Sequence, residues 1–182
     1  FATGGIGGVH RGAELSFDIS ADLQELAQTP VTVVAAGAKA ILDLAKTYEV
    51  LETLGVPVIA FGQDMLPAFW SASSDMAAPL RMDGASDIAR AQMTRTAMGL
   101  SGGQLIANPI PKDAEIPADV LRPIIDQALK EADAQGVSAK AVTPFLLGRI
   151  FELTDGQSLT ANIALVRNNA RLAAQIAIAM GK

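Results

Sequence analysis

The residues that could do chemistry gather in the first thirty-nine positions of the chain. Residues 3–12 read Thr-Gly-Gly-Ile-Gly-Gly-Val-His-Arg-Gly and include the only histidine, His10. Asp18 and Asp22 follow four positions apart, and Lys39 comes after an Ala-Gly-Ala sequence. Glycine has no side chain to bury and costs backbone entropy, so a cluster of glycines predicts a backbone that closely approaches something else. An anion or a sugar is one such neighbour.

The glycine cluster does not match the common nucleotide-binding motifs. Gly5-Ile-Gly7 begins like G-x-G-x-x-G, but His10 occupies the sixth place and no acidic residue follows at the expected distance. No Gly-Lys-Ser/Thr follows, which excludes a P-loop. A sharp turn between packed elements explains the glycines alone equally well. With His10 and Arg11 beside them, a loop that faces an anion or a sugar is favoured, although a lone histidine is more often packed or superficial.

Asp18 and Asp22 have a structural explanation and a functional one. The helix dipole favours a carboxylate in a first helical turn, which suits Asp22, and Asp18 is then a turn former. Alternatively, Asp18 supplies the hard oxygen ligand that Mg²⁺ or Mn²⁺ prefers. Ser20, Ala21 and Asp22 would then present helix-start N–H groups and side-chain oxygens to a sugar or a phosphate.

Lys39 follows the apolar run 31–36, which is typical of a buried strand. Open α/β sheets bind ligands at the carboxyl ends of their strands, where Lys39 is expected. An ammonium group among apolar neighbours loses hydration, which makes the neutral amine accessible, and this amine can form a Schiff base with carbonyl carbon. The alternative is a lysine at a helix start whose charged end reaches water. On these residues alone, the alternative is slightly favoured.

The rest of the chain predicts an α/β scaffold that holds these residues. Half of the 182 residues are apolar, and aromatic residues are scarce, as in helices packed on a buried sheet. Strands are predicted at 31–36, 56–61 and 102–109, and an irregular segment at 62–85. Helices are predicted at about 21–28, 38–54, 86–100, 117–135, 143–153 and 159–180. We therefore expect one domain, 1–182, of the α/β class with a mostly parallel sheet.

Composition excludes several other classes of protein. The net charge of −5 argues against sequence-independent nucleic-acid binding, which needs a basic surface. The absence of cysteine excludes disulfides and Cys-ligated zinc. Neither a membrane-spanning run nor a signal peptide is visible, so we expect no membrane partner and a cytoplasmic location.

Seven stretches of the chain form long, specific motifs: 1–14, 17–26, 36–43, 51–57, 107–111, 143–147 and 158–170. They resemble the pseudouridine-5′-phosphate glycosidase family, which includes the indigoidine synthase A-like proteins. The resemblance covers essentially the whole chain. It implies a three-layer α/β/α fold, a homotrimer, and the Mn²⁺-dependent, reversible cleavage of pseudouridine 5′-phosphate to uracil and ribose 5-phosphate, with other divalent metals possible.

The resemblance also implies roles for particular residues. Lys39 matches the lysine that bonds to C1′ of the ring-opened ribose, which makes a C–C glycosidic bond cleavable. Asp18 resembles the metal ligand, although Asp22 could hold the ion instead. Substrate-binding positions are matched by Thr3, Ser20, Ala21, Asp22 and Asn162, and His10 lies in the glycine segment that lines the same site.

The family's proton-donor glutamate and a phosphate-contacting lysine lie in an N-terminal part that precedes the Phe-Ala-Thr-Gly-Gly sequence. This chain begins at that sequence, with Phe1. We therefore expect a fragment or processed product that is poorly soluble and at best a slow catalyst alone. The alternative function is an inactive fragment or paralogue that binds a sugar phosphate or assembles with a full-length relative.

Overall fold

A computed structural model describes residues 1–137 and 141–181 and shows a parallel four-stranded sheet. The strands are β1 (Thr32–Ala35), β2 (Val58–Phe61), β3 (Leu80–Met82) and β4 (Gln104–Ala107), in the spatial order β1-β4-β2-β3. Each pair is parallel, with Val34 opposite Ile106 and Ile59 opposite the same residue. The predicted α/β fold with a mostly parallel sheet is therefore confirmed.

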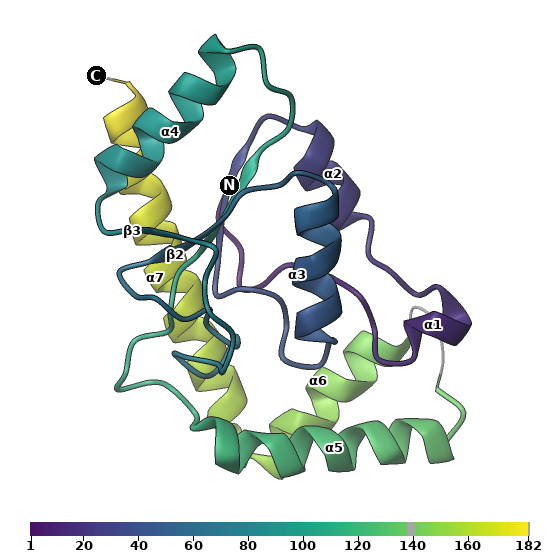
Figure 1. Ribbon diagram of the computed structural model, residues 1–182. Helices are drawn as coiled ribbons and strands as arrows, with labels where there is room; N and C mark the ends of the chain where they lie inside the picture. The colour runs from purple at the N-terminus through teal and green to yellow at the C-terminus, as the bar shows by residue number, and fades with distance from the viewer. Residues whose placement is uncertain (138–140, 182) are drawn as a thin grey trace.

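Helices cover both faces of this sheet (Figure 1). On one face lie α2 (Asp22–Gln28) and α3 (Leu44–Thr53), and on the other lie α4 (Ala85–Ala97) and α7 (Gln157–Met180). Side chains alternate between the faces, so that Val33 belongs to the core on the α2–α3 side and Val34 packs with residues of α4 and α7. Burial on both faces accounts for the continuous apolar runs that predicted the strands.

The remaining helices lie outside the two helical layers that cover the sheet (Figure 1). Helices α5 (Ala118–Ala134) and α6 (Val142–Leu153) pack against each other, and Arg149 of α6 binds Glu131 of α5. Helix α1 (Ala13–Ser16) is a single turn in the N-terminal region. The ends of the six predicted helices agree with the structure to within about three residues, except at the start of α3.

Two sequence predictions differ from the structure. Helix α3 begins at Leu44 rather than near Ala38, because residues 38–43 form a turn bonded to the N-terminal segment. Asp43 ends this turn and caps α3, since its side chain accepts the N–H of Lys46 at 3.1 Å. The segment 62–85, predicted to be wholly irregular, contains β3. This strand has only three residues and is largely exposed, so it leaves no recognisable strand pattern in the sequence.

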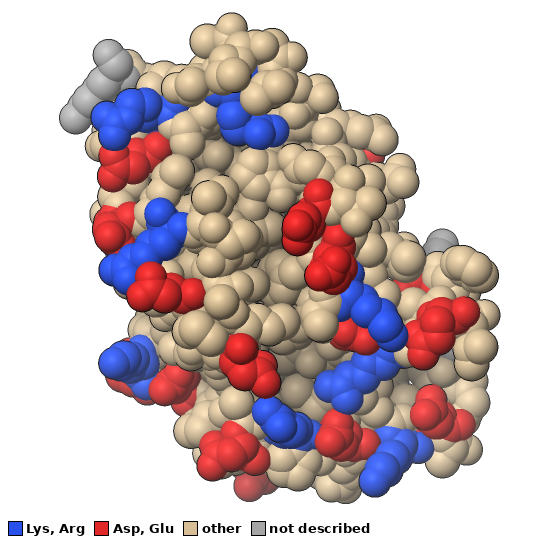
Figure 2. All heavy atoms as spheres, in the orientation of Figure 1, with Lys and Arg blue, Asp and Glu red and all other residues tan. Residues whose placement is uncertain are grey.

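Acidic and basic side chains are interspersed on the surface. Figure 2 shows Lys and Arg beside Asp and Glu over much of one face. Arg11 pairs with Asp126 at 2.9 Å, and Lys46 pairs with Glu14 at 2.9 Å. These exposed pairs add little stability because solvent screens them. Within the described ranges, no helix is both long enough and apolar enough to cross a membrane.

Candidate functional site

A cavity of about 350 Å³ brings together Lys39, Thr3 and Asp22. Lys39 lies in the turn after β1, Thr3 in the N-terminal extended segment, and Asp22 at the first position of α2. Lys39 is therefore near the carboxyl end of a parallel strand, as predicted, but it is not at a helix start. The remainder of the lining is mostly apolar and includes Phe1, Ile6, Leu26, Val31 and Val33. An amine in this cavity has both polar and apolar neighbours.

Backbone hydrogen bonds fix the turn that carries Lys39 against the N-terminal segment. The N–H of Ala36 donates to the carbonyl of Gly4 at 2.8 Å, and the N–H of Ile6 donates to Gly37 at 3.1 Å. The N–H of Lys39 then donates to the carbonyl of Ile6 at 3.1 Å. The main chain at Lys39 is consequently held in register with the glycines rather than left as a free loop.

Close packing explains several of the glycines. A Cβ on Gly7 would overlap with the side chain of Ser20, and one on Gly8 would overlap with Thr47. A Cβ on Gly5 would lie 2.7 Å from the ring of Phe69. These glycines allow chain segments of the protein itself to approach each other, which supports the packing explanation at these three positions.

The start of α2 is bonded directly to the glycine segment. Asp22 Oδ2 accepts the N–H of Gly7 at 2.7 Å, and Ser20 Oγ accepts the N–H of Asp22 at 3.2 Å. The N–H of Ser20 donates to the carbonyl of Gly8 at 2.9 Å. Ala21 is the N-cap residue of α2 and is exposed. The Asp22 carboxylate therefore both lines the cavity and fixes the glycine segment.

His10 and Asp18 lie beside each other but are not among the residues that line the Lys39 cavity. The N–H of His10 donates to the carbonyl of Asp18 at 3.0 Å, and His10 Nδ1 is 4.0 Å from Asp18 Oδ2. The Asp18 side chain is 41 % exposed. In the part of the chain that the structure describes, no three His, Cys, Asp or Glu side chains gather into a metal-binding group.

The donor set at Asp18 still fits one kind of cation site. Mg²⁺ and similar hard cations bind through one or two carboxylates while water and substrate oxygens complete the shell. Asp18 offers one accessible carboxylate of this kind, and the nearby imidazole of His10 is a second candidate donor. A site made only of protein side chains does not fit these residues.

Asn162 lies on α7 and is not among the residues that line the Lys39 cavity. A Cβ on Gly4 would be 3.4 Å from Asn162 Oδ1, which places this amide against the glycine segment. Asn162 Oδ1 is buried and has no hydrogen-bond partner within the described ranges. A buried acceptor without a partner is costly, and a ligand donor that reached this oxygen would remove that cost.

Sequence reasoning missed Glu25, which lines the same cavity as Asp22. The two residues are three positions apart on α2, so they lie on one face of that helix. This spacing was readable in the sequence. Glu25 Oε2 accepts the hydroxyl of Thr29 at 2.9 Å, and Thr29 also lines the cavity.

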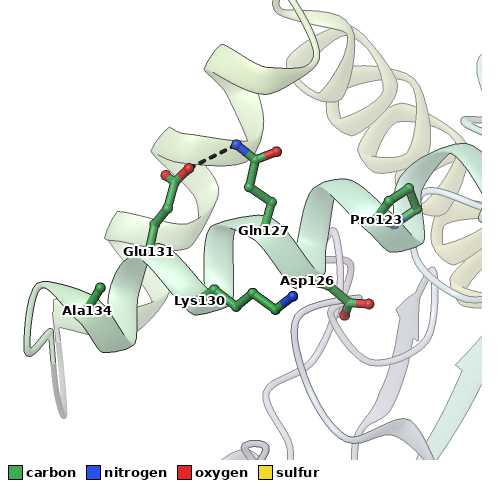
Figure 3. A pocket seen from close by; sticks show the side chains of 6 residues that line it. All are labelled: Pro123, Asp126, Gln127, Lys130, Glu131 and Ala134. Atoms are coloured by element: carbon green, nitrogen blue, oxygen red, sulfur yellow. Dashed lines mark hydrogen bonds between the residues drawn. The ribbon is translucent and has the colours of Figure 1, made fainter.

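A larger hollow elsewhere contains none of the predicted site residues. It has a volume of about 460 Å³ and is formed along one helix, α5, where Gln127 donates to Glu131 at 2.9 Å (Figure 3). Arg149 holds the pKa of Glu131 below its ordinary value. Among the described residues, one helix supplies all of this lining, so its groups do not converge on a substrate from several elements. The Lys39 cavity is the better candidate.

The fold and the cavity define an α/β protein with a lysine placed near the carboxyl edge of a parallel sheet. The sequence profile of the family described as "Indigoidine synthase A like protein" matches residues 1–179. The chain therefore belongs to the indigoidine synthase A-like family, as its resemblance implied.

Curated relatives carry a more specific name. The chain is 76% identical over 180 residues to the pseudouridine-5′-phosphate glycosidase of Paracoccus denitrificans, covering 99% of this chain and 59% of that protein. It is 72% identical to the protein of the same name from Jannaschia, with 99% and 60% covered. The chain thus spans about three fifths of the length of these relatives.

Two solved structures share the fold. One is the prealnumycin C-glycosynthase in complex with ribulose 5-phosphate, with a TM-score of 0.92, 36% identity, and 99% of this chain and 59% of that one covered. The other is an indigoidine synthase A-like protein from Thermotoga maritima, with a TM-score of 0.90, 35% identity, and 100% and 59% covered.

Proposed function

We propose that this chain carries the lysine-bearing part of a C-glycosidase site that cleaves pseudouridine 5′-phosphate reversibly to uracil and ribose 5-phosphate. The observation that carries the proposal is the placement of Lys39 with Thr3 and Asp22 in one partly apolar cavity. The names of the curated relatives support the substrate. The sugar phosphate bound to the structurally similar C-glycosynthase supports the substrate class.

Lys39 would act as a nucleophile. Its neutral amine attacks C1′ of the ribose, a C1′–N bond forms, and the ring oxygen leaves and takes up a proton. The uracil carbon bonded to C1′ is then protonated, and the nitrogen lone pair expels it, leaving a C1′ iminium and neutral uracil. Water adds to the iminium and releases ribose 5-phosphate and free Lys39. A C–C glycosidic bond has no leaving oxygen or nitrogen whose protonation would break it. The nitrogen lone pair of Lys39 instead forms the C1′ iminium as the C–C bond breaks.

Neighbouring residues would bind and orient the substrate. Thr3 and Asp22 line the cavity, and the helix-start residues Ser20 and Ala21 lie next to them at the N-terminus of α2. Asn162 Oδ1 is an unpaired acceptor that suits a sugar hydroxyl.

Asp18, with His10 nearby, would hold Mn²⁺, and that ion would neutralise phosphate or oxyanion charge when bound. His10 stays a candidate catalytic residue because its ring nitrogen is close to this carboxylate. Assembly as a homotrimer and a cytoplasmic location stay predictions from the family resemblance.

The alternative function does not include catalysis by this chain alone. The chain spans 59% of the first relative's length. The chain would then bind a sugar phosphate without turnover, or assemble with a full-length relative. Adduct formation with ribose 5-phosphate but no cleavage of pseudouridine 5′-phosphate in the presence of Mn²⁺ would favour this second function.

Borohydride trapping tests the role of Lys39. Reduction in the presence of ribose 5-phosphate should fix the mass of the sugar phosphate on the peptide that contains Lys39, as measured by mass spectrometry. Lys39→Ala should abolish the label, whereas Lys46→Ala should keep it, because Lys46 is an exposed, ion-paired lysine of α3. A label that persists in Lys39→Ala would overturn the assignment.

A further inference from the structure

A pair of buried amides connects the sheet to the glycine segment. Asn169 of α7 has no exposed surface, and Asn108, which follows β4, is 3 % exposed. Asn108 Nδ2 donates to Asn169 Oδ1 at 2.9 Å. Asn169 Nδ2 donates in turn to the carbonyl of Thr3 at 2.8 Å and to that of Gly4 at 3.3 Å.

Each polar atom of the Asn169 side chain has at least one hydrogen-bond partner. Its oxygen accepts one bond and its NH₂ group donates two, so the cost of burying the amide is offset. Asn108 fixes the orientation of the Asn169 amide. The NH₂ group of Asn108 is a donor, so the oxygen of the Asn169 amide must face it. The donor nitrogen of Asn169 is therefore directed at the glycine segment.

The carbonyls that Asn169 holds belong to the residues next to the lysine turn. Thr3 lines the Lys39 cavity, and the Gly4 carbonyl also accepts the N–H of Ala36 at 2.8 Å. The same ladder continues to the bond between Ile6 and Lys39. Displacement of Thr3 and Gly4 would shift one wall of the cavity relative to the amine.

We propose that Asn169 is a positioning residue for the reaction of Lys39, acting through the main chain of Thr3 and Gly4. The proposal rests on the proposed function, since it needs a sugar adduct at Lys39. Asn169 lies two helical turns after Asn162 on the same face of α7. This face therefore contacts the glycine segment through two asparagine side chains. Its contribution is geometric: it holds the cavity wall at the distance from which the amine can reach C1′.

Asn169→Asp tests the proposal with little change in shape. A carboxylate would place an oxygen opposite the two carbonyls and remove both donated bonds. Asn168→Asp is the matched control, because Asn168 Nδ2 donates to the carbonyl of Pro109 at 3.0 Å and so also loses a bond to a carbonyl. The maximal rate of borohydride labelling and the half-saturating ribose 5-phosphate concentration are measured for both variants, with hydrogen exchange of the Ile6 and Lys39 amides.

We expect Asn169→Asp to lower the maximal labelling rate about 10- to 100-fold with little change in half-saturation, and to speed exchange at Ile6 and Lys39. Asn168→Asp should leave both unchanged. If Asn169→Asp does not fold, Asn169→Ser is used, with the same split expected on a smaller scale. Equal labelling rates in the Asn168 and Asn169 variants overturn the positioning role alone. Failure of the unaltered chain to label overturns the proposed function and the reaction role of Asn169 together.

Discussion

Thr47→Val removes the hydroxyl that joins the glycine segment to α3. Thr47 Oγ1 accepts the N–H of Val9 at 2.9 Å, and both residues are buried. The same hydroxyl donates to the carbonyl of Asp43 at 2.7 Å, but that carbonyl also accepts the main-chain N–H of Thr47. Valine keeps the shape of the side chain, so the change leaves one buried donor, the Val9 N–H, without a partner.

The cost follows from that single donor. Leaving a buried polar group unpaired costs about 1–3 kcal/mol. With an m-value of about 2 kcal/mol/M, the midpoint of urea unfolding should fall by about 0.5–1.5 M while m stays the same. The assay is urea unfolding of the 182-residue chain, followed by circular dichroism.

A matched control is available in the same helix. Thr53 is exposed at the end of α3, so Thr53→Val should change the free energy of unfolding by less than about 0.5 kcal/mol. Thr47→Ser keeps the hydroxyl and should retain the Val9 bond at the cost of a methyl group. If Thr47→Val and Thr53→Val unfold at the same urea concentration, the hydroxyl does not support the glycine segment as described.

Three further outcomes can be measured. Tyr48 is the only tyrosine, and burial raises its pKa to about 12, so the near-ultraviolet absorbance of phenolate should appear only near that pH. Because the ordinary pKa of tyrosine is 10.0, the stability that buried, neutral Tyr48 contributes should be fully present below pH 10 and be lost as the pH rises toward 12; a normal titration of the folded chain would refute this. Gly7→Ala should destabilise the fold by about 1–3 kcal/mol because its Cβ overlaps with Ser20, with thermal unfolding as the measurement and an unchanged melting temperature as the contrary result. Asp18→Asn should weaken Mn²⁺ binding in calorimetry while Asp22→Asn affects sugar-phosphate binding more, and equal metal affinity in the unaltered chain and Asp18→Asn would assign the metal elsewhere.

Local pattern was sufficient to predict most of the scaffold. Strands β1, β2 and β4 are buried on both faces of the sheet, and such burial requires a continuous apolar run that can be recognised in the sequence. The position of Lys39 beyond β1 followed from that apolar run and from the place of Lys39 directly after it in the sequence. The start of α3 did not, because the turn before it is held by a bond between Val9 and Asp43, which are far apart in the sequence.

Site residues that are close together in the sequence could be predicted from it, whereas residues that meet only in the folded chain could not. Ser20, Ala21 and Asp22 belong to one helix start, and their spacing indicates that directly. Asn108 and Asn169 gave no such signal, because an asparagine on a helix or after a strand is ordinarily a surface residue. Only the tertiary fold shows that their amides meet.

The bond between Asn169 and Thr3 joins residues that are 166 positions apart. During synthesis at about 5–20 residues per second, Thr3 would be added to the chain roughly 10–30 s before Asn169. The lysine turn and the glycines can form their hydrogen bonds early, because they are close in the sequence. The bond that holds the cavity wall at Thr3 can form only after α7 has been made. Closing so long a loop is slow, so the cavity should be among the last parts of the molecule to become ordered. A nascent chain halted before α7 would carry the amine of Lys39 without the geometry that we propose it uses.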